Sequence, residues 1–411
     1  MTANDRFFQR QQPAAVLKHS VLSEYCAVFT SMTGSAGFGA TVWIIDGYAG
    51  PGAYDGDAEG GGAVDGSPLV AMRSAQQWRT RASPRDLRGV FIEADPVQAT
   101  ALRANLAPFQ QDGLTAVVLE GTVEEHLPAA WSRVGEAPVV TFLDPFGVAL
   151  PCDTMTRVLM DPRRRAPSEV LVNVNLEAVR RLGGWLAYRD GEVVPAEDRF
   201  RRGVERVDRF FGDPSWRRLF FEARTSDDGT AASAAEVVVA QYRARVGQLT
   251  GYQSMSIPIR RGQNQPALFH LTLFYRHPAA GYKFADAAAR ATKKWRETYW
   301  AQYWDRKLDD TPSLFEPEDI AAMTLAEAQR REAELAEQWV DSISNNISTL
   351  IARYQQIRVA DHVVDILGDT LSFAGERHIR KAWDALANQG AVGARDTTKK
   401  YLHTLDIVAK R

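Results

Sequence analysis

Acidic side chains follow three separate apolar runs, each of which is typical of a buried strand. Asp46, Glu93 and Asp144 come directly after these runs. Because parallel strands in an α/β sheet end at one edge, the three carboxylates are expected to line a common cleft there. Carboxylate oxygens accept hydrogen bonds from hydroxyl and amino groups. The pattern therefore favours a site for a ligand that carries such groups, such as a nucleoside.

A glycine-rich loop follows the first of these strands and reads Asp46-Gly47-Tyr48-Ala49-Gly50-Pro51-Gly52. Glycine at a strand end lets the backbone approach a ligand closely and tolerates positive φ. The loop lacks the Lys-Ser/Thr of a P-loop, which disfavours a nucleoside triphosphate. It resembles the first motif of S-adenosylmethionine (SAM) methyltransferases, and this resemblance implies that Asp46, Tyr48, Gly50 and Gly52 contact SAM. The alternative is an ordinary tight turn.

The next two strand ends offer further candidates for the same ligand. Glu93 ends the second strand, where a carboxylate can accept both ribose hydroxyls; the alternative is a carboxylate that favours the start of the following helix. Thr122 follows the third strand, at the place where methyltransferases often contact the adenine ring. Glu120 could make that contact instead, and a plain polar strand exit is the other alternative.

The motif Asp144-Pro145-Phe146-Gly147 ends the strand at 139–143. It resembles the Asp/Asn-Pro-Pro-aromatic pattern of nucleic-acid amino-methyltransferases, in which the polar side chain orients the target amino group and the ring stacks on the base. The resemblance implies that Asp144, Pro145 and Phe146 are catalytic. Phe146 replaces the second proline and Gly147 the aromatic residue, which departs from that pattern. The alternative is a strand-terminating turn with Phe146 in the core.

Alternating strand and helix patterns must position these residues, and they predict an α/β fold with a Rossmann-like sheet covered on both faces. A helix at 14–29 leads into the first strand. The expected central strands are 41–45, 87–92, 116–119, 139–143 and 169–174. Two more, at 253–259 and 267–275, resemble the antiparallel hairpin that often closes a methyltransferase sheet.

The C-terminal region differs in composition from the rest of the chain. Short helices are expected at 360–367, 378–389 and 398–409, with a glycine-edged wing at 390–393. From residue 376 onward there are eight Lys or Arg side chains and four acidic ones. This pattern indicates a winged helix-turn-helix, and a plain helical cap is the alternative. The expected domains are 1–300 (methyltransferase-like), 301–354 (helical connector) and 355–411 (winged helix-turn-helix-like).

Composition limits the class of protein. The chain has 411 residues, 45% of them hydrophobic, with a net charge of −2. No run is apolar enough for a membrane span and the N-terminus lacks a signal-peptide pattern, so a cytoplasmic protein without a membrane partner is expected. The two cysteines and seven histidines show no metal-ligand spacing, so no metal site is expected.

Four motifs together resemble the three-Cys-motif partner (TcmP) family. They are Lys18-His19-x-x-Leu22-x-x-Tyr25, the Asp46 loop, Gly66-Ser67-Pro68-Leu69 and the Asp144 motif, and they occur in the family's order. The segment 269–278 with Gly281 is similar to a late strand of that family. The resemblance implies that Lys18 and His19 close over the cleft and that a three-Cys-motif protein is a partner.

The combined interpretation is a SAM-dependent methyltransferase that acts on nucleic acid. A non-catalytic methyltransferase-like module that binds nucleic acid or a partner protein is the main alternative. An NAD-linked oxidoreductase is disfavoured because Gly-x-Gly-x-x-Gly is absent: Tyr54 and Asp55 follow Gly50 and Gly52.

Overall fold

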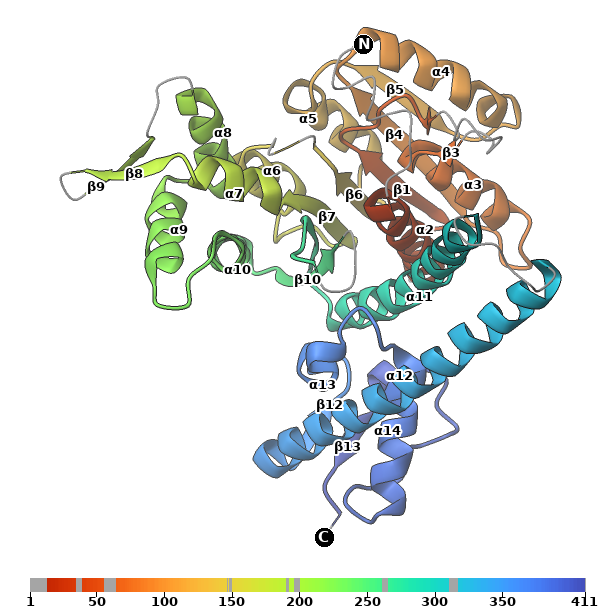
Figure 1. Cartoon of the computed structure of the whole chain (residues 1–411). Coiled ribbons are helices and arrows are strands. Elements are labelled where there is room, and N and C mark those ends of the chain that lie inside the picture. The colour runs from red at the N-terminus through yellow and green to blue at the C-terminus, as the bar shows by residue number, and fades with distance from the viewer. Residues whose placement is uncertain are drawn as a thin grey trace. The chain divides into compact units, whose positions relative to one another are not determined.

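The computed structural model divides the chain into two compact units, 1–276 and 277–411, which are described separately (Figure 1). The expected domain boundaries at residues 300 and 354 stay predictions. The structure describes residues 13–34, 39–54, 64–145, 147, 150–189, 192–195, 200–260, 265–309 and 317–410.

A seven-stranded mixed sheet forms the centre of the first unit. Its order is β5-β4-β1-β6-β7-β11-β10, in which β11 runs antiparallel to both of its neighbours. This is a Rossmann-like α/β sheet, and all seven expected strands are confirmed. The strands are β1 Thr41–Asp46, β4 Asp86–Glu93, β5 Ala116–Glu120, β6 Val139–Leu143, β7 Ser168–Asn175, β10 Gln253–Ile259 and β11 Phe269–Tyr275.

Strand β1 lies where the strand order reverses, with β4 on one side and β6 on the other. In the register, Ile45 is opposite Val90 of β4 and Thr141 of β6. Crevices at such a reversal, outside the carboxyl ends of the strands, are the usual ligand sites of open α/β sheets. The loop after Asp46 leaves the sheet at this point.

Helices cover both faces of the sheet, as its apolar parallel strands require. One face packs on α5 (Val123–Val134), α6 (Cys152–Leu159) and α10 (Ala231–Thr250), which share a buried cluster with Ile45 and Val172. The other face carries α2 (Pro13–Thr33), α3 (Ser67–Arg79) and α4 (Pro96–Gln111). Two short antiparallel strands, β2 (Ala53–Tyr54) and β3 (Val64–Asp65), follow the glycine loop.

An insertion begins where β7 ends, at the same edge of the sheet as Asp46 and Asp144. It contains α7 (Leu176–Gly183), β8 (Leu186–Arg189), β9 (Glu192–Pro195), α8 (Arg201–Phe211) and α9 (Ser215–Thr225), seen at the side of the sheet in Figure 1. Helix α8 contacts α6, the helix after the Asp144 loop. Rings from α8 pack on α10: Phe210 stacks on Tyr242 with 5.0 Å between ring centroids.

The second unit contains two long helices and a small C-terminal fold. Its elements are α11 (Pro278–Asp309), α12 (Pro317–Tyr354), β12 (Gln356–Arg358), α13 (Val363–Leu367), α14 (Glu376–Asn388) and β13 (Asp406–Val408). The helices expected at 360–367 and 378–389 are confirmed as α13 and α14. None of the described helices is long and apolar enough to cross a membrane.

The helix expected at 398–409 is wrong. Residues 402–404 form a single 3₁₀ turn, and β13 then pairs antiparallel with β12. Only Ile407 of β13 is buried, opposite Ile357, so burial follows the alternation of a strand and not a helical period. An isolated bridge joins Val392 to Ala409 beside this pair. Pairing with β12, which is distant in sequence, therefore determines that residues 406–408 form a strand.

Candidate cofactor and substrate site

The glycine loop after β1 is attached to both neighbouring strands. Gly47 N donates to Phe142 O of β6 at 2.9 Å, and Ala49 N donates to Ile92 O of β4 at 3.0 Å. Gly50 and Gly52 have φ of +62° and +84°, which L side chains rarely adopt. The loop therefore follows the carboxyl ends of these strands in a conformation that needs glycine at these two positions.

Asp46 is a buried carboxylate at the start of this loop, 1% exposed. Its Oδ1 accepts a hydrogen bond from Tyr48 N at 3.1 Å, whereas the buried Oδ2 has no partner at hydrogen-bonding geometry among the described residues. Burial raises its pKa to about 7, and the charges of Asp144 and Glu93 add to this; Ser67 and the Tyr48 backbone partly offset it. Asp46 is thus an acceptor held without its full set of donors.

Glu93, at the end of β4, connects the glycine loop to the adjacent helix. Its Oε2 accepts from Gly50 N at 2.7 Å and its Oε1 accepts from Asp95 N at 2.8 Å. A carboxylate has about four acceptor positions, so each oxygen can still accept a further donor. Glu93 therefore both fixes the conformation of Gly50 and keeps capacity for ligand hydroxyls.

Asp144 is held between a helix and a strand. Lys18 Nζ of α2 is ion-paired with its Oδ2, and Asn173 Nδ2 of β7 donates to its Oδ1 at 2.7 Å. The Lys18 and Asp144 side chains are each 14% exposed. Pro145 is buried, and Phe146 lies outside the described residues. The structure thus brings Lys18 together with Asp144, and the closure of Lys18 and His19 over the cleft stays a prediction.

Asn173 is the site residue that sequence reasoning missed. It is 2% exposed on β7, and its Oδ1 has no hydrogen-bond partner among the described residues. A polar residue within the apolar run Leu171-Val172-Asn173-Val174 is the signal that could have found it. Such a residue in a buried strand needs a partner, and here the partner is Asp144.

His19 and Tyr54 extend the site beside these carboxylates. Their rings stack with 6.3 Å between centroids. Burial and the charge of Lys18 lower the pKa of His19 to about 4, with Asp144 acting in the opposite direction, so this ring is neutral at pH 7. The pKa of Tyr54 is raised by burial and then by Asp144, Asp46 and Glu93. All three strand-end carboxylates thus contribute to the raised pKa of this phenol.

Two predicted cofactor residues have structural partners of their own. Thr122 is the N-cap of α5 and forms a capping box with Glu125, in which Thr122 N donates to Glu125 Oε2 at 3.0 Å. Tyr48 packs against the apolar cluster beneath the sheet, and burial raises its pKa. Glu120, the alternative to Thr122, is paired with Arg103 at 2.9 Å. Their contact with a cofactor stays a prediction. No group of three potential metal ligands occurs in the described part of the chain.

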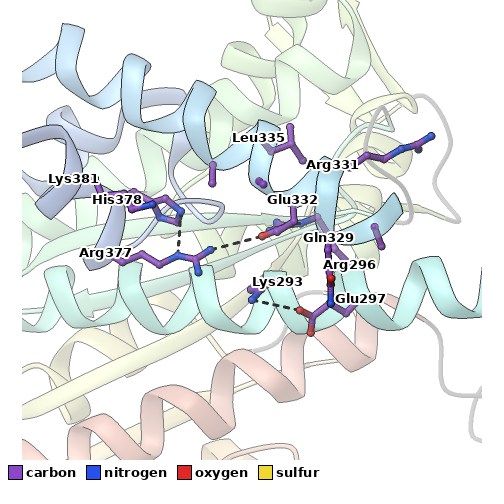
Figure 2. A pocket seen from close by; sticks show the side chains of 13 residues that line it. Lys293, Arg296, Glu297, Gln329, Arg331, Glu332, Leu335, Arg377, His378 and Lys381 are labelled. Carbon is purple, nitrogen blue, oxygen red and sulfur yellow. Dashed lines mark hydrogen bonds and ion pairs between the residues drawn. The ribbon is translucent and has the colours of Figure 1, made fainter. Parts of the chain in front are cut away.

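A separate hollow of about 600 Å³ lies within the second unit, among α11, α12 and α14 (Figure 2). Its charges are largely paired: Arg296 contacts both oxygens of Glu332, Arg377 lies 3.9 Å from Glu332, and Lys293 lies 3.5 Å from Glu297. Figure 2 shows Arg377 directed toward Glu332 and Lys293 directed toward Glu297. The hollow contains none of the predicted site residues, and its ion pairs connect α11, α12 and α14.

No protein-family model matches this chain, and no curated protein matches its sequence. The chain has distant structural similarity to SAM-dependent methyltransferases. An O-methyltransferase from Bacillus cereus in complex with SAH is 9% identical, over 62% of this chain and 80% of that one, with a TM-score of 0.28. An RNA methyltransferase from Salinibacter ruber in complex with S-adenosyl-L-homocysteine is 20% identical, over 41% and 92%, with a TM-score of 0.21. SCL7 from Oryza sativa is 13% identical, over 62% and 78%, with a TM-score of 0.31. These likenesses concern the fold alone.

Proposed function

We propose that this protein is a SAM-dependent methyltransferase whose acceptor is nucleic acid. The observation that carries the proposal is Asp46: a buried carboxylate with an unpartnered oxygen, in a positive-φ glycine loop at the reversal of strand order. A buried acceptor without a donor is costly, and a ligand amino group would remove that cost.

The residues present fit SAM in type and arrangement. The ammonium group of its methionine part suits Asp46, and its ribose hydroxyls suit Glu93, whose oxygens keep free acceptor positions. The positive-φ loop at Gly50 and Gly52 would present backbone atoms to SAM, and Tyr48 and Thr122 are further proposed contacts. When bound, SAM supplies an electrophilic methyl group; the protein's part is to hold and orient the two reactants.

Asp144 is the proposed acceptor-orienting group. A target amino group would donate to its carboxylate, which Asn173 and Lys18 hold in place. His19, neutral at pH 7, adds no positive charge beside the cationic cofactor. Pro145 shapes the backbone at this strand end, and Phe146 is the proposed stacking surface for the base.

The C-terminal residues support a second part of this proposal. A strand, two helices, a bridge and a returning strand follow α12 in the order of a winged helix-turn-helix, and α14 exposes Arg377 and Lys381. We propose that this region assists nucleic-acid binding. Membership of the TcmP family and association with a three-Cys-motif protein are part of the same proposal, and they rest on the four sequence motifs.

Transfer of radiolabelled methyl from SAM to total RNA and to genomic DNA tests this function. The wild-type protein should transfer label to either RNA or DNA. Asp144→Ala should reduce this labelling by at least 100-fold, while the affinity for SAM changes less than threefold. Equal labelling by wild type and Asp144→Ala would show that Asp144 has no role in methyl transfer. Absence of labelling on both substrates, with SAM bound, would contradict a nucleic-acid acceptor.

A non-catalytic binding module is the second candidate, favoured by the engagement of both Asp144 oxygens with Lys18 and Asn173. In that case the pair is structural and Asp144→Ala affects stability alone. Nucleic-acid binding without methyl transfer, retained in a folded Asp144→Ala variant, distinguishes this module from the enzyme.

A further inference from the structure

Helix α8 carries a stripe of exposed arginines in the insertion that follows β7. Arg202, Arg206 and Arg209 are spaced i, i+4 and i+7. At 100° per residue these positions fall within about 60° of one another around the helix. The buried residues Val204, Val207 and Phe211 lie on the opposite side. The stripe is therefore directed away from the core.

These three arginines have no ion-pair or hydrogen-bond partner among the described residues. Together with Glu205 and Asp208 they line a hollow of about 520 Å³. Asp208 does not offset them, because it accepts from Trp216 Nε1 at 2.8 Å and from Arg217 Nε at 2.9 Å. Among the described residues that line this hollow, Glu205 is therefore the one acidic side chain left to oppose the three guanidinium groups.

Two other arginines of the insertion have acidic partners. Arg217 is paired with Asp208, and Arg218 lies 3.7 Å from Glu222. The arginines at 202, 206 and 209 remain available, and their helix is held by aromatic packing on α10.

The position of α8 relates the stripe to the cleft. The insertion leaves the sheet at the carboxyl end of β7, and α8 packs on α6, which begins a few residues after Asp144. From Arg202 to Arg209 the helix rises about 10 Å, a length along which one nucleic-acid strand presents about three phosphates. Guanidinium groups suit phosphates because they form paired, charge-assisted hydrogen bonds.

We propose that the α8 arginine stripe (Arg202, Arg206 and Arg209) binds the phosphodiester backbone of a nucleic acid whose nucleotide reaches the Asp144 cleft. This inference rests on the proposed function for the identity of the acceptor. Phosphate contacts position a substrate without reading its sequence, so the stripe supplies affinity and register.

The test compares two triple variants of the full chain. Arg202→Gln/Arg206→Gln/Arg209→Gln removes the stripe, and Arg133→Gln/Arg157→Gln/Arg165→Gln removes three exposed arginines that precede β6 and β7 at the opposite edge of the sheet. The two variants have equal net charge. The probes are a fluorescent 20-nucleotide single-stranded RNA, single-stranded DNA and duplex DNA of the same length, measured by anisotropy from 50 to 300 mM KCl.

The stripe variant should bind at least one probe tenfold or more weakly at 100 mM KCl than wild type does. Its plot of log affinity against log salt should be shallower by about 2, for three phosphates on a single strand. The control variant should stay within twofold of wild type. Equal losses in the two variants, no loss in either, or no binding of any probe by wild type would overturn the proposal.

Two further measurements distinguish this proposal from an acidic-protein partner and from the proposed methyltransferase function. Poly-glutamate that competes as well as the RNA would assign the stripe to an acidic protein and contradict a nucleic-acid site. SAM titration of the stripe variant should match wild type. Stripe-dependent RNA binding in a protein that fails to bind SAM would defeat the proposed function and leave the stripe intact, whereas SAM binding without RNA binding would defeat the stripe alone.

Discussion

Lys18 of α2 is ion-paired with Asp144 at the end of β6, and the two side chains are almost equally shielded from water. Two turns further along the same helix, the Tyr25 hydroxyl donates to the buried carboxylate of Glu169 near the start of β7. Helix α2 is thus fastened to one face of the sheet by polar contacts at both edges. These contacts connect the stability of the helix to the geometry of the candidate site.

The Lys18–Asp144 pair should be energetically coupled. A double-mutant cycle with Lys18→Met and Asp144→Asn is expected to give a coupling energy of about 1–3 kcal/mol, since the pair is largely shielded from solvent. The exposed pair Arg88–Asp86, whose side chains are 39% and 42% exposed, provides the control and should give less than about 1 kcal/mol. Urea unfolding of each variant supplies the energies. Equal coupling in the two cycles would contradict a shielded, specific pair.

Gly52 should be less tolerant of alanine than Gly39, although both have φ of +84°. A Cβ on Gly52 would lie 2.9 Å from Leu102 Cδ1, whereas a Cβ on Gly39 would meet no described atom within 4 Å. Gly39→Ala should therefore cost only the backbone strain of about 1–2 kcal/mol. Gly52→Ala should cost about 1–3 kcal/mol more, because of overpacking. Chemical denaturation measures both, and equal losses would show that the loop relaxes around the new methyl group.

Asp46→Asn should stabilise the protein without ligand, and more so at high pH. Burial raises the pKa of Asp46 to about 7, so the folded state resists its ionisation. At pH values below about 4, the pKa of this carboxyl group in the unfolded chain, ionisation of Asp46 takes no free energy from the folded state. Its cost grows as pH rises toward 7 and then stays constant at about 4 kcal/mol.

The unfolding free energy of Asp46→Asn minus that of wild type should therefore be larger at pH 8 than at pH 5. Other groups with shifted pKa values are present in both proteins and cancel in this difference. A difference that stays the same at the two pH values would contradict the raised pKa of this buried carboxylate.

Tyr25→Phe should destabilise the protein by about 1–3 kcal/mol, because it leaves Glu169 buried without its donor. Burial raises the pKa of Glu169 to about 7, and the bond from Tyr25 opposes this rise by favouring the ionised form. The loss should therefore be largest above pH 7 and smaller at pH 5. In a Glu169→Gln background the pH dependence of the Tyr25→Phe effect should disappear. Its persistence there would assign the effect to another titrating group.

Sequence reasoning reached the sheet and its acidic edge because both are local patterns. Each strand is an apolar run, and the polar residue that ends it, such as Asp46 or Glu93, is visible in the sequence. It did not reach Asn173 or the exact partner of Lys18, because those contacts join segments far apart in the chain. The strand at Asp406–Val408 was missed for the same reason: its partner β12 lies about 50 residues earlier.

The insertion after β7 gives a second example of contacts that the sequence does not reveal. The arginines of residues 201–218 can be read from the sequence, but their ion-pair partners cannot. Asp208 selects Arg217 as its partner through the packing of α9 on α8, and this leaves Arg202, Arg206 and Arg209 free. Only the folded arrangement separates structural arginines from available ones.

Isothermal titration of the full chain with SAM at pH 8 tests the central claim most directly, with Asp46→Asn as the paired variant and circular dichroism to verify folding. The account predicts one binding site in wild type and an affinity at least tenfold lower in Asp46→Asn, because the ammonium group of SAM loses its carboxylate. Absence of binding to folded wild type at millimolar SAM, or equal affinity in the two proteins, would contradict it.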